Sequence, residues 1–146
     1  EVLPPSIDRI IMLDTDIFLK DDIALLWDEF DKFGSTQMLG LALAQDQVYR
    51  KCRLPRHEDT KTFQGFNGGL QLLRLDRMRR NASYNALISP GLFPDWFHRN
   101  KTVCGRIYGG WTLGDQDFYV LLSGLHREWF HTVPCSWNIQ TCAAWM

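Results

Sequence analysis

The stretch Ile10-Ile11-Met12-Leu13-Asp14-Thr15-Asp16 decides the fold class of this chain. It continues a mostly apolar run that begins at Ile7, is rich in β-branched residues and has the length of a buried strand. Two carboxylates, Asp14 and Asp16, follow directly at the carboxyl end of this run. Side chains two residues apart in an extended segment point to the same side. We therefore expect both carboxylates to face one site.

Strand-like and helix-like segments alternate along the rest of the chain. Apolar runs of strand length and segments with helical i, i+3, i+4 spacing follow one another, separated by Gly, Pro and Asp residues. The sequence predicts strands at 7–13, 38–44, 69–75 and 129–133, helices at 23–33, 76–88 and 115–122, a polar loop at 45–65 and an irregular aromatic segment at 90–110. This order predicts an α/β fold with a largely parallel or mixed sheet flanked by helices.

Two polar stretches fall at the boundaries of predicted strands. Asp14-Thr15-Asp16 ends the first strand, and Asn67-Gly68-Gly69 leads into the third. In sheets of this kind ligands collect at the carboxyl ends of strands. We therefore expect these two stretches to belong to a functional site.

The composition excludes several classes of protein. Hydrophobic residues make up 45% of the 146 residues and aromatic residues 13%, which excludes intrinsic disorder and fits one globular domain or a piece of a larger one. A net charge of −1 argues against a nucleic-acid binder, which needs a basic surface. No apolar run approaches the roughly 20 residues that span a bilayer. The chain starts at Glu1 without a signal peptide, so a targeting segment would lie outside it.

The cysteines and the glycosylation sequons together point to the secretory pathway. The four cysteines form no C-x-x-C pair and have no histidine at zinc-finger spacing, so a structural zinc site is not expected. Their even number permits two disulfides in three possible pairings. Two sequons begin at Asn81 and Asn100, and sequons beside paired cysteines are typical of lumenal proteins. The cysteines are Cys52, Cys104, Cys135 and Cys142.

The carboxylates of Asp14 and Asp16 suit a hard divalent cation, Mn²⁺ or Mg²⁺, that also holds phosphate oxygens. One alternative is a solvated loop that only follows the strand. Another is a phosphatase in which the two aspartates act as nucleophile and acid. That motif needs Thr or Val two residues after the second Asp, where this chain has Phe18.

Three further groups of polar residues each have a structural alternative. Asn67-Gly68-Gly69 offers an amide beside residues that let a ligand approach the backbone, or it is a plain β-turn. Gly114-Asp115-Gln116-Asp117 offers two carboxylates and an amide, or it caps a helix. Trp137-Asn138 could present an aromatic face and an amide to a sugar, or the Trp is buried in the core. His131, on an apolar segment, is expected to be a core histidine with a hydrogen-bond partner.

The order of these motifs along the chain resembles glycosyltransferase family 8. The motifs are the apolar strand with Asp14-Thr15-Asp16, Phe66-Asn67-Gly68-Gly69, Leu113-Gly114-Asp115-Gln116-Asp117-Phe118 and Trp137-Asn138. Finer features resemble one branch of it, the xyloside α-1,3-xylosyltransferases: Val48-Tyr49-Arg50, Gly65-Phe66-Asn67, Leu75-Asp76-Arg77-Met78-Arg79 and the segment Cys135 to Cys142. The likeness extends over nearly the whole chain.

The resemblance implies a GT-A fold, a Rossmann-like α/β domain that binds a nucleotide sugar through Mn²⁺, with Mg²⁺ as a possible substitute. Carried over residue by residue, it implies that Asp14 and Asp16 hold the metal. Asp115 and Gln116 would be the catalytic residues, and Trp137 and Asn138 would bind the acceptor. The donor-binding residues would be Thr15, Asn67, Gly68, Leu113, Asp115 and Gln116.

The resemblance also implies a retaining reaction. Gln116 would lie beneath the anomeric carbon, where a neutral amide can stabilise an oxocarbenium-like sugar without forming a covalent intermediate. We therefore expect front-face substitution, in which the departing phosphate helps to deprotonate the incoming hydroxyl. The other possibility is a glycosyl-enzyme intermediate on Asp115 or Asp117.

The chain departs from the family pattern in two ways. Gly68 stands where the family commonly has Ser or Thr. The family's third metal ligand, a His, would lie beyond Met146, and the strand and helix that hold uracil and ribose would precede Glu1. We therefore expect residues 1–146 to be the central part of a catalytic domain that is incomplete at both ends and inactive alone.

The implied activity is the transfer of xylose from UDP-α-D-xylose, in α-1,3 linkage, to a xylosyl-glucose O-glycan on EGF repeats of Notch-type receptors. Alternatives are another family 8 transferase, of the matriglycan or glucoside xylosyltransferase type, and a non-catalytic carbohydrate-binding domain on the same scaffold. The implied protein is a type II membrane protein of the endoplasmic reticulum or Golgi lumen, with its anchor outside this chain. Cys135 and Cys142 could form a local disulfide, or either could pair with Cys52 or Cys104.

Overall fold

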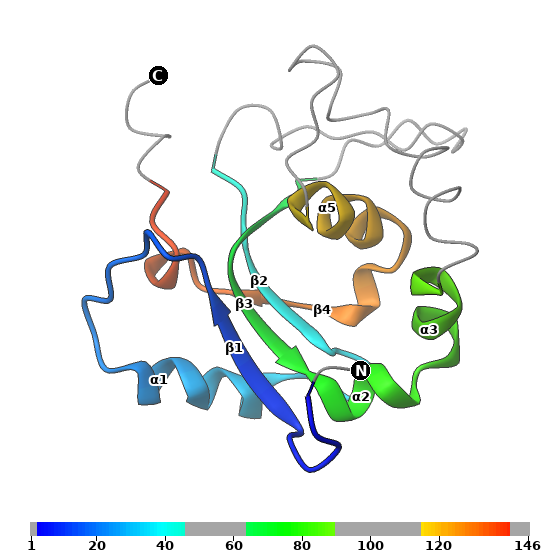
Figure 1. Cartoon of the computed structure of the whole chain (residues 1–146). Coiled ribbons are helices and arrows are strands. Elements are labelled where there is room, and N and C mark those ends of the chain that lie inside the picture. The colour runs from blue at the N-terminus through cyan, green and yellow to red at the C-terminus, as the bar shows by residue number, and fades with distance from the viewer. Residues whose placement is uncertain (1–2, 46–63, 90–114, 141–146) are drawn as a thin grey trace.

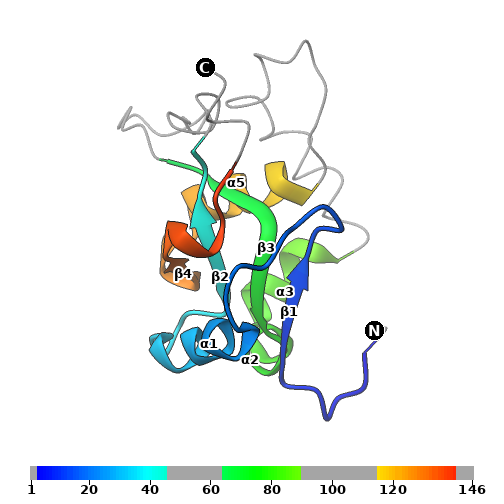
Figure 2. The same cartoon turned by 90° about the vertical axis from the view of Figure 1, so that its left-hand side faces the viewer.

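The computed structural model describes residues 3–45, 64–89 and 115–140, and these contain one mixed sheet (Figures 1 and 2). Its strand order is β1-β3-β2-β4. Strand β3 is antiparallel to both of its neighbours, and β2 is parallel to β4. The strands are β1 (Arg9–Leu13), β2 (Leu39–Leu43), β3 (Phe66–Arg74) and β4 (Phe130–Val133). The predicted α/β fold with a mixed sheet is confirmed.

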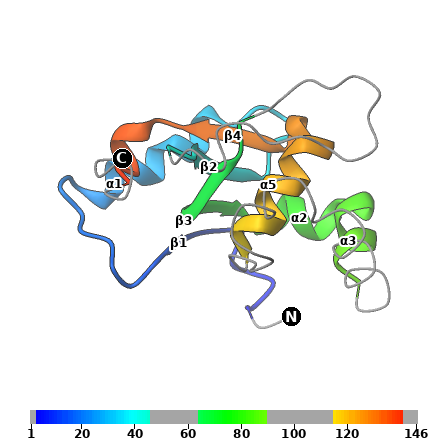
Figure 3. The same cartoon turned by 90° about the horizontal axis from the view of Figure 1, so that it is seen from above.

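Helices cover both faces of this sheet (Figure 3). The helices are α1 (Ile23–Trp27), α2 (Leu75–Arg80), α3 (Ala82–Ile88) and α5 (Asp115–Leu125). Short 3-10 helices at Asp28–Lys32, Arg127–Trp129 and Cys135–Trp137 extend α1 and flank β4. None of the helices in the described part of the chain is long and apolar enough to cross a membrane.

The alternation of side chains along β3 divides the core into two clusters. Leu73 faces a cluster that includes Phe118 and Leu122 of α5. Leu70 and Leu72 face the opposite side of the sheet, where the second cluster contains Leu26, Phe30 and Phe33. Because successive residues of a strand point to opposite faces, an almost unbroken apolar run can support both layers. The sheet therefore holds α5 on one face and α1 on the other.

The helix predicted at 76–88 is wrong in one respect, because it is two helices that are separated by Asn81. The Asn81 backbone is extended, and its side-chain oxygen accepts a hydrogen bond from the backbone N–H of Tyr84 at 2.9 Å. An asparagine in this position caps a new helix rather than continuing the old one. Helix α3 therefore starts after Asn81 at an angle to α2 (Figure 1).

Other predicted bounds shift by a few residues. The segment 23–33 is α1 followed by a 3-10 turn, and the last predicted helix continues to Leu125. Strand β3 begins at Phe66 and not at Gly69, so Asn67 and Gly68 lie inside the strand. The predicted loop at 45–65 and the aromatic segment at 90–110 fall almost wholly outside the described residues.

The arginine-rich segment after β3 fixes the chain that leads into β1. Asp76 accepts two hydrogen bonds from the Arg74 guanidinium, both of 2.9 Å, and this pairing is the main reason that the pKa of Asp76 falls to about 2. Arg79 donates to the backbone carbonyl of Ile7 at 2.8 Å and to carbonyls of the preceding residues. Arg77 donates to two carbonyls in the turn before β2. In the described structure this segment has an architectural role.

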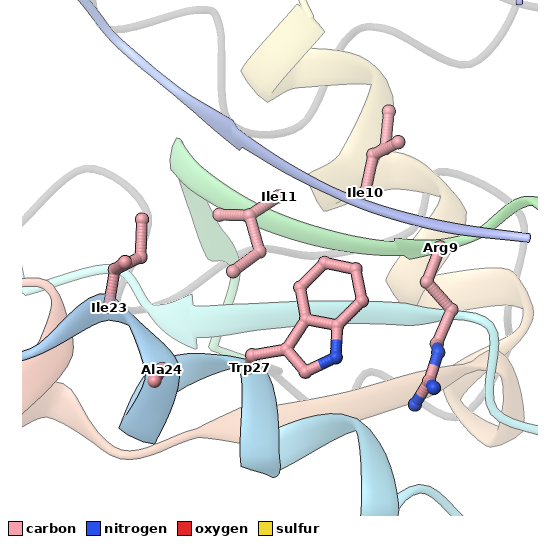
Figure 4. A pocket seen from close by; sticks show the side chains of 6 residues that line it. All are labelled: Arg9, Ile10, Ile11, Ile23, Ala24 and Trp27. Atoms are coloured by element: carbon pink, nitrogen blue, oxygen red, sulfur yellow. The ribbon is translucent and has the colours of Figure 1, made fainter. Parts of the chain in front are cut away.

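An apolar groove of about 520 Å³ opens between β1 and α1 (Figure 4). Ile11, Ile23 and Trp27 point into it, and the Arg9 guanidinium lies 5.3 Å from the Trp27 ring centroid. Strand β1 is also the edge of the described sheet. This edge therefore leaves apolar side chains only half covered. The lining residues are Arg9, Ile10, Ile11, Ile23, Ala24 and Trp27.

Candidate functional site

The carboxyl end of β1 and the amino end of β3 lie at the same end of the sheet, because the two strands are antiparallel. Leu13 pairs with Leu70, and the backbone N–H of Asp14 donates to the carbonyl of Gly69 at 2.9 Å. This pairing brings together Asp14-Thr15-Asp16 and Asn67-Gly68-Gly69, two stretches that the sequence analysis selected and that lie far apart in the chain. This meeting point is the candidate site.

Gly69 allows two oxygen-bearing side chains to approach the same point of the backbone. A Cβ added at Gly69 would lie 3.1 Å from Oδ2 of Asp14 and 3.1 Å from Oδ1 of Asn67. Both distances are shorter than normal carbon–oxygen contacts, so a side chain at this position would displace one of the oxygens. A carboxylate oxygen, which is a ligand that hard divalent cations prefer, therefore lies beside the Asn67 amide.

If the site holds Mn²⁺, as the resemblance implies, Gly69→Ala in the complete protein is expected to weaken Mn²⁺ binding and to destabilise the fold by about 1–3 kcal/mol, because the new methyl group crowds Asp14 and Asn67. Thermal unfolding and Mn²⁺ titration followed by electron paramagnetic resonance measure the two effects. Gly34→Ala is the control, since the atoms nearest to a Cβ there are those of Gln37, at ordinary contact distances of 3.6 Å or more. Unchanged Mn²⁺ affinity in Gly69→Ala would contradict the placement of Asp14 in a metal site.

A chain of neutral amides crosses the site from β3 to α5. Asn138 Nδ2 donates to Asn67 Oδ1 at 2.8 Å, and this oxygen also accepts from the Gly69 N–H at 2.9 Å. Asn67 Nδ2 in turn donates to Oε1 of Gln116 at 3.4 Å. The side-chain orientation of Gln116 thus depends on Asn67, and that of Asn67 on Asn138. The sequence analysis predicted all three residues as part of one site, and the structure brings them together.

The first turn of α5 lies directly over Gly68. A Cβ added at Gly68 would lie 3.6 Å from Cα and Cβ of Gln116 and 3.8 Å from Oδ1 of Asp115, which are ordinary contact distances. The acidic residues Asp115 and Asp117 occupy this turn, where the helix dipole favours negative charge. Burial, with smaller effects from Tyr84 and Asp115, raises the pKa of Tyr119, so this phenol on the same helix stays neutral.

Gln71 is a residue of this region that the sequence analysis missed. It is buried within β3, and its Nε2 donates to the Gly68 carbonyl at 2.8 Å and to Asp115 Oδ2 at 3.0 Å. The signal in the sequence was a single polar residue within the apolar run from Leu70 to Leu73. Only the fold shows that it points toward α5.

The backbone after β1 differs from the extended segment that the sequence predicted. Thr15 and Asp16 form a turn, in which the Ile17 N–H donates to the Asp14 carbonyl at 3.4 Å. Short polar residues favour such turns, because their side chains compete for backbone hydrogen bonds. The period-two argument for the two carboxylates is therefore wrong, although Asp14 does reach the site. Thr15 and Asp16 are exposed.

No cluster of three or more His, Cys, Asp or Glu residues with metal-binding geometry occurs among the described residues. The oxygen atoms that the described part of the site offers to a metal are those of Asp14 and Asp16, because Asn67 Oδ1 already accepts two hydrogen bonds. Their chemistry fits Mn²⁺ or Mg²⁺, which bind carboxylates and amide carbonyls. Further ligands would come from outside these residues.

Several predicted residues lie at the border of the site or outside the described structure. Trp137 is half-buried and packs against the second core cluster, so it is not the fully buried Trp of the core alternative, and its acceptor role stays a prediction. The β-turn alternative for Asn67-Gly68-Gly69 is wrong, because these residues lie in β3. His131 stacks on Phe33 at 4.7 Å and lies 3.4 Å from Oε2 of buried Glu29, as expected of a core histidine.

The modification sites remain predictions. Cys135 is exposed and is the single cysteine in the described residues, so its pairing with Cys142 lies outside them. Asn81 caps α3, and the other two residues of its sequon, Ala82 and Ser83, lie in the first turn of that helix. Leu113 and Asn100 also lie outside the described residues.

Comparisons with known proteins agree on one family. The family model "Glycosyl transferase family 8" matches residues 1–144. Xyloside xylosyltransferase 1 of Mus musculus is 35% identical over 155 residues, and the match covers 99% of this chain and 38% of the relative. Xylosyl- and glucuronyltransferase LARGE2 of Mus musculus is 32% identical over 143 residues, covering 95% and 19%.

A solved structure shows the same fold. The crystal structure of mouse xyloside xylosyltransferase 1 in its apo form superimposes with a TM-score of 0.75 at 34% sequence identity. The match covers 99% of this chain and 51% of that chain. The chain therefore spans about half of the solved relative and well under half of the curated relatives that it matches.

Proposed function

This chain belongs to glycosyltransferase family 8, and from this membership we propose that it is the central part of a retaining, Mn²⁺-dependent xylosyltransferase. The donor would be UDP-α-D-xylose. The acceptor would be a xylosyl-glucose O-glycan on EGF repeats, extended in α-1,3 linkage. Xylosyltransferase relatives from two groups support xylose transfer in general.

One observation supports this proposal above the others. Oxygens of Asp14 and Asn67 converge over Gly69, and Asn67 also holds Gln116 at the start of α5. A transferase of nucleotide sugars needs a cation site for the diphosphate directly beside a polar group for the sugar. The two requirements meet within this set of contacts.

In the proposed mechanism Asp14 and Asp16 hold the metal from the end of β1. When bound, Mn²⁺, or Mg²⁺ in its place, would stabilise the negative charge that develops on the diphosphate as the glycosidic bond breaks. The main-chain hydrogen bond from Asp14 to Gly69 fixes where this charge can be neutralised. Thr15 would lie against the donor from the same turn.

Gln116 would face the anomeric carbon. Its Oε1 accepts one hydrogen bond from Asn67 and keeps a second lone pair, which can stabilise positive charge on the sugar. A neutral amide is a poor nucleophile, which favours front-face attack by the acceptor hydroxyl over a covalent intermediate. Asn138, and Trp137 beside it, would form the acceptor side of the same network.

We also propose that residues 1–146 are the central part of a larger domain. The half-covered apolar groove beside β1, which is the edge strand among the described residues, is the kind of surface that another part of a domain covers. This chain spans 38% of xyloside xylosyltransferase 1, so a protein of that length has further residues that could cover the groove. The complete protein would be a glycosylated type II membrane protein of the endoplasmic reticulum or Golgi lumen, with an anchor outside this chain.

The proposal predicts a single pentose transfer by the complete protein. Its lumenal form is incubated with Mn²⁺, a panel of UDP-sugars and an EGF repeat that carries O-linked xylose-glucose, and the product mass is measured. We expect a gain of one pentose from UDP-xylose, loss of activity in EDTA, and no turnover by residues 1–146 alone. Absence of metal-dependent turnover with every donor would contradict the proposal and favour a non-catalytic carbohydrate-binding domain.

A second function within the family is favoured by the similarity to LARGE2, whose name assigns it xylosyl- and glucuronyltransferase activity. The assay is repeated with a glucuronyl acceptor of the matriglycan type and with an EGF repeat that carries only O-linked glucose. Such an enzyme would leave the xylose-glucose EGF repeat unmodified and transfer xylose to the glucuronyl acceptor. Transfer to O-linked glucose instead would identify a glucoside xylosyltransferase. The acceptor that gains mass therefore separates these enzymes.

A further inference from the structure

Gln71 is a buried polar residue in a strand that is otherwise apolar around it. Its exposed fraction is 2%, and its neighbours Leu70 and Leu72 are fully buried. Both hydrogens of its Nε2 are used, one by the Gly68 carbonyl at 2.8 Å and one by Oδ2 of Asp115 at 3.0 Å. Its Oε1 is buried and accepts no hydrogen bond from the residues that the structure describes.

These contacts fix the orientation of the Gln71 amide. The carbonyl of Gly68 and the carboxylate of Asp115 are both acceptors, so only the nitrogen can face them. The price is a buried oxygen without a partner, which is unfavourable for folding. An apolar residue of similar size, such as methionine, would remove that unfavourable atom. The hydrogen bonds of Gln71 therefore point to a role in the candidate site, because its buried oxygen lowers the stability of β3.

Gln71 determines which oxygen of Asp115 is available. Oδ2 is held against β3 by Gln71, whereas Oδ1 lies 3.8 Å from the position that a Cβ on Gly68 would take. Oδ1 has no hydrogen-bond partner among the described residues, whereas Oδ2 accepts from Gln71. Asp115 is exposed at the start of α5, so it has no other burial that would fix its carboxylate.

We propose that Gln71 is a positioning residue, which holds Asp115 so that its Oδ1 accepts a hydrogen bond from a hydroxyl of the donor sugar. This inference rests on the proposed function and deepens it. Gln71 itself does not touch the sugar. It acts through its hydrogen bonds to Asp115 Oδ2 and to the Gly68 carbonyl.

Gln71→Met in the complete protein tests the proposal. We expect the KM for UDP-xylose to rise roughly 10- to 100-fold, the effect of a lost hydrogen bond to a charged group. The change in kcat should be smaller, because the contact exists before the transition state. The melting temperature should stay the same or rise, since the unpaired Oε1 is gone. A residue with a merely structural role would give the opposite pattern, a lower melting temperature with an unchanged KM.

Leu73→Met is the matched control. Leu73 lies two residues further along β3 on the same face, and it is also buried. We expect its KM to equal that of the wild type. A KM in Gln71→Met within twofold of the wild type would overturn the proposal, and so would an equal rise in both variants.

A second measurement keeps this inference separate from the proposed function. Three-bond couplings in isotope-labelled protein report the χ1 rotamer of Asp115 without any substrate. We expect one rotamer in the wild type and averaging in Gln71→Met. Averaging in the variant alone would support the positioning role even if the wild type turned over no UDP-sugar, whereas the same single rotamer in both proteins would contradict it.

Discussion

Asp14→Asn in the complete protein is expected to lower xylose transfer by about three orders of magnitude, because a bound metal contributes several kcal/mol to stabilising the leaving diphosphate. Asparagine keeps the shape of the side chain over Gly69, where a Cβ would lie 3.1 Å from Asp14 Oδ2. It also keeps the backbone hydrogen bond to the Gly69 carbonyl. Only the negative charge is lost, so the fold should be preserved.

The assay measures kcat/KM for UDP-xylose together with Mn²⁺ affinity by electron paramagnetic resonance. Asp8→Asn is the matched control, since it removes the same charge from an exposed position just before β1, at the opposite end of the strand. We expect the control to keep wild-type activity and metal affinity. If Asp14→Asn bound Mn²⁺ as tightly as the control, Asp14 would not be a metal ligand.

The sequence predicted the layers of the fold because its strands carry a local signal. The run from Ile10 to Leu13 is apolar, β-branched and ends at a carboxylate, and β1 ends at Leu13 as expected. Helix breaks were harder to predict. Asn81 fits within a helical pattern by spacing, and only its hydrogen bond to the Tyr84 N–H shows that it starts a new helix. Local competition between a side chain and the backbone decided that boundary.

The start of β3 was missed for a similar reason. Asn67 and Gly68 are residues typical of turns, yet they lie inside the strand because the β2 residue Leu43 pairs with Phe66 and α5 covers Gly68. Tertiary contacts overrode the local preference of these residues. The site residues could still be predicted, because the order of the motifs along the chain resembles a family, and a family match is independent of element boundaries.

Gln71 could not be assigned from sequence. Its partner Asp115 lies 44 residues further along the chain, and a polar residue in a strand does not reveal which helix it will face. A similar limit applies to the network from Asn138 through Asn67 to Gln116, where the first contact spans 71 residues. The residue types could be predicted, but the hydrogen bonds that orient them follow from the packing of α5 on β3 and from the pairing of β4 with β2.

The site contains both charged carboxylates and neutral amides. The carboxylate of Asp14 lies at the end of β1, while the hydrogen bonds that join β3 to α5 involve the amides of Asn67 and Gln116 and the carboxylate of Asp115, which Gln71 holds. A sugar that gains positive charge would thus meet amide oxygens, and a diphosphate would meet the metal. Under the proposed function, this arrangement fits a reaction in which cleavage of the glycosidic bond precedes attack by the acceptor hydroxyl.

Gln116→Ala is expected to lower kcat of the complete protein by about 100-fold, the scale of losing one preorganised dipole at a developing charge. The KM for UDP-xylose should change less, because the positive charge on the sugar appears only in the transition state. Steady-state kinetics with UDP-xylose and the EGF-repeat acceptor measure both constants. Gln37→Ala is the control: it also removes an amide, one bonded to the Phe130 carbonyl away from the site, and it should affect stability but not kcat.

Mass spectrometry of the quenched reaction adds the decisive comparison between the two mechanisms. Front-face substitution leaves no sugar on the protein in the wild type or in Gln116→Ala. A pentose ester on Asp115 or Asp117 would establish a covalent intermediate instead, and Gln116 would then have a role in binding only. Full turnover by Gln116→Ala would remove the amide from the mechanism altogether.

Asn67→Ala should also lower kcat, because Asn67 orients Oε1 of Gln116. If the two residues act as one unit, the loss of kcat in the double variant should be smaller than the sum of the two single losses in free energy.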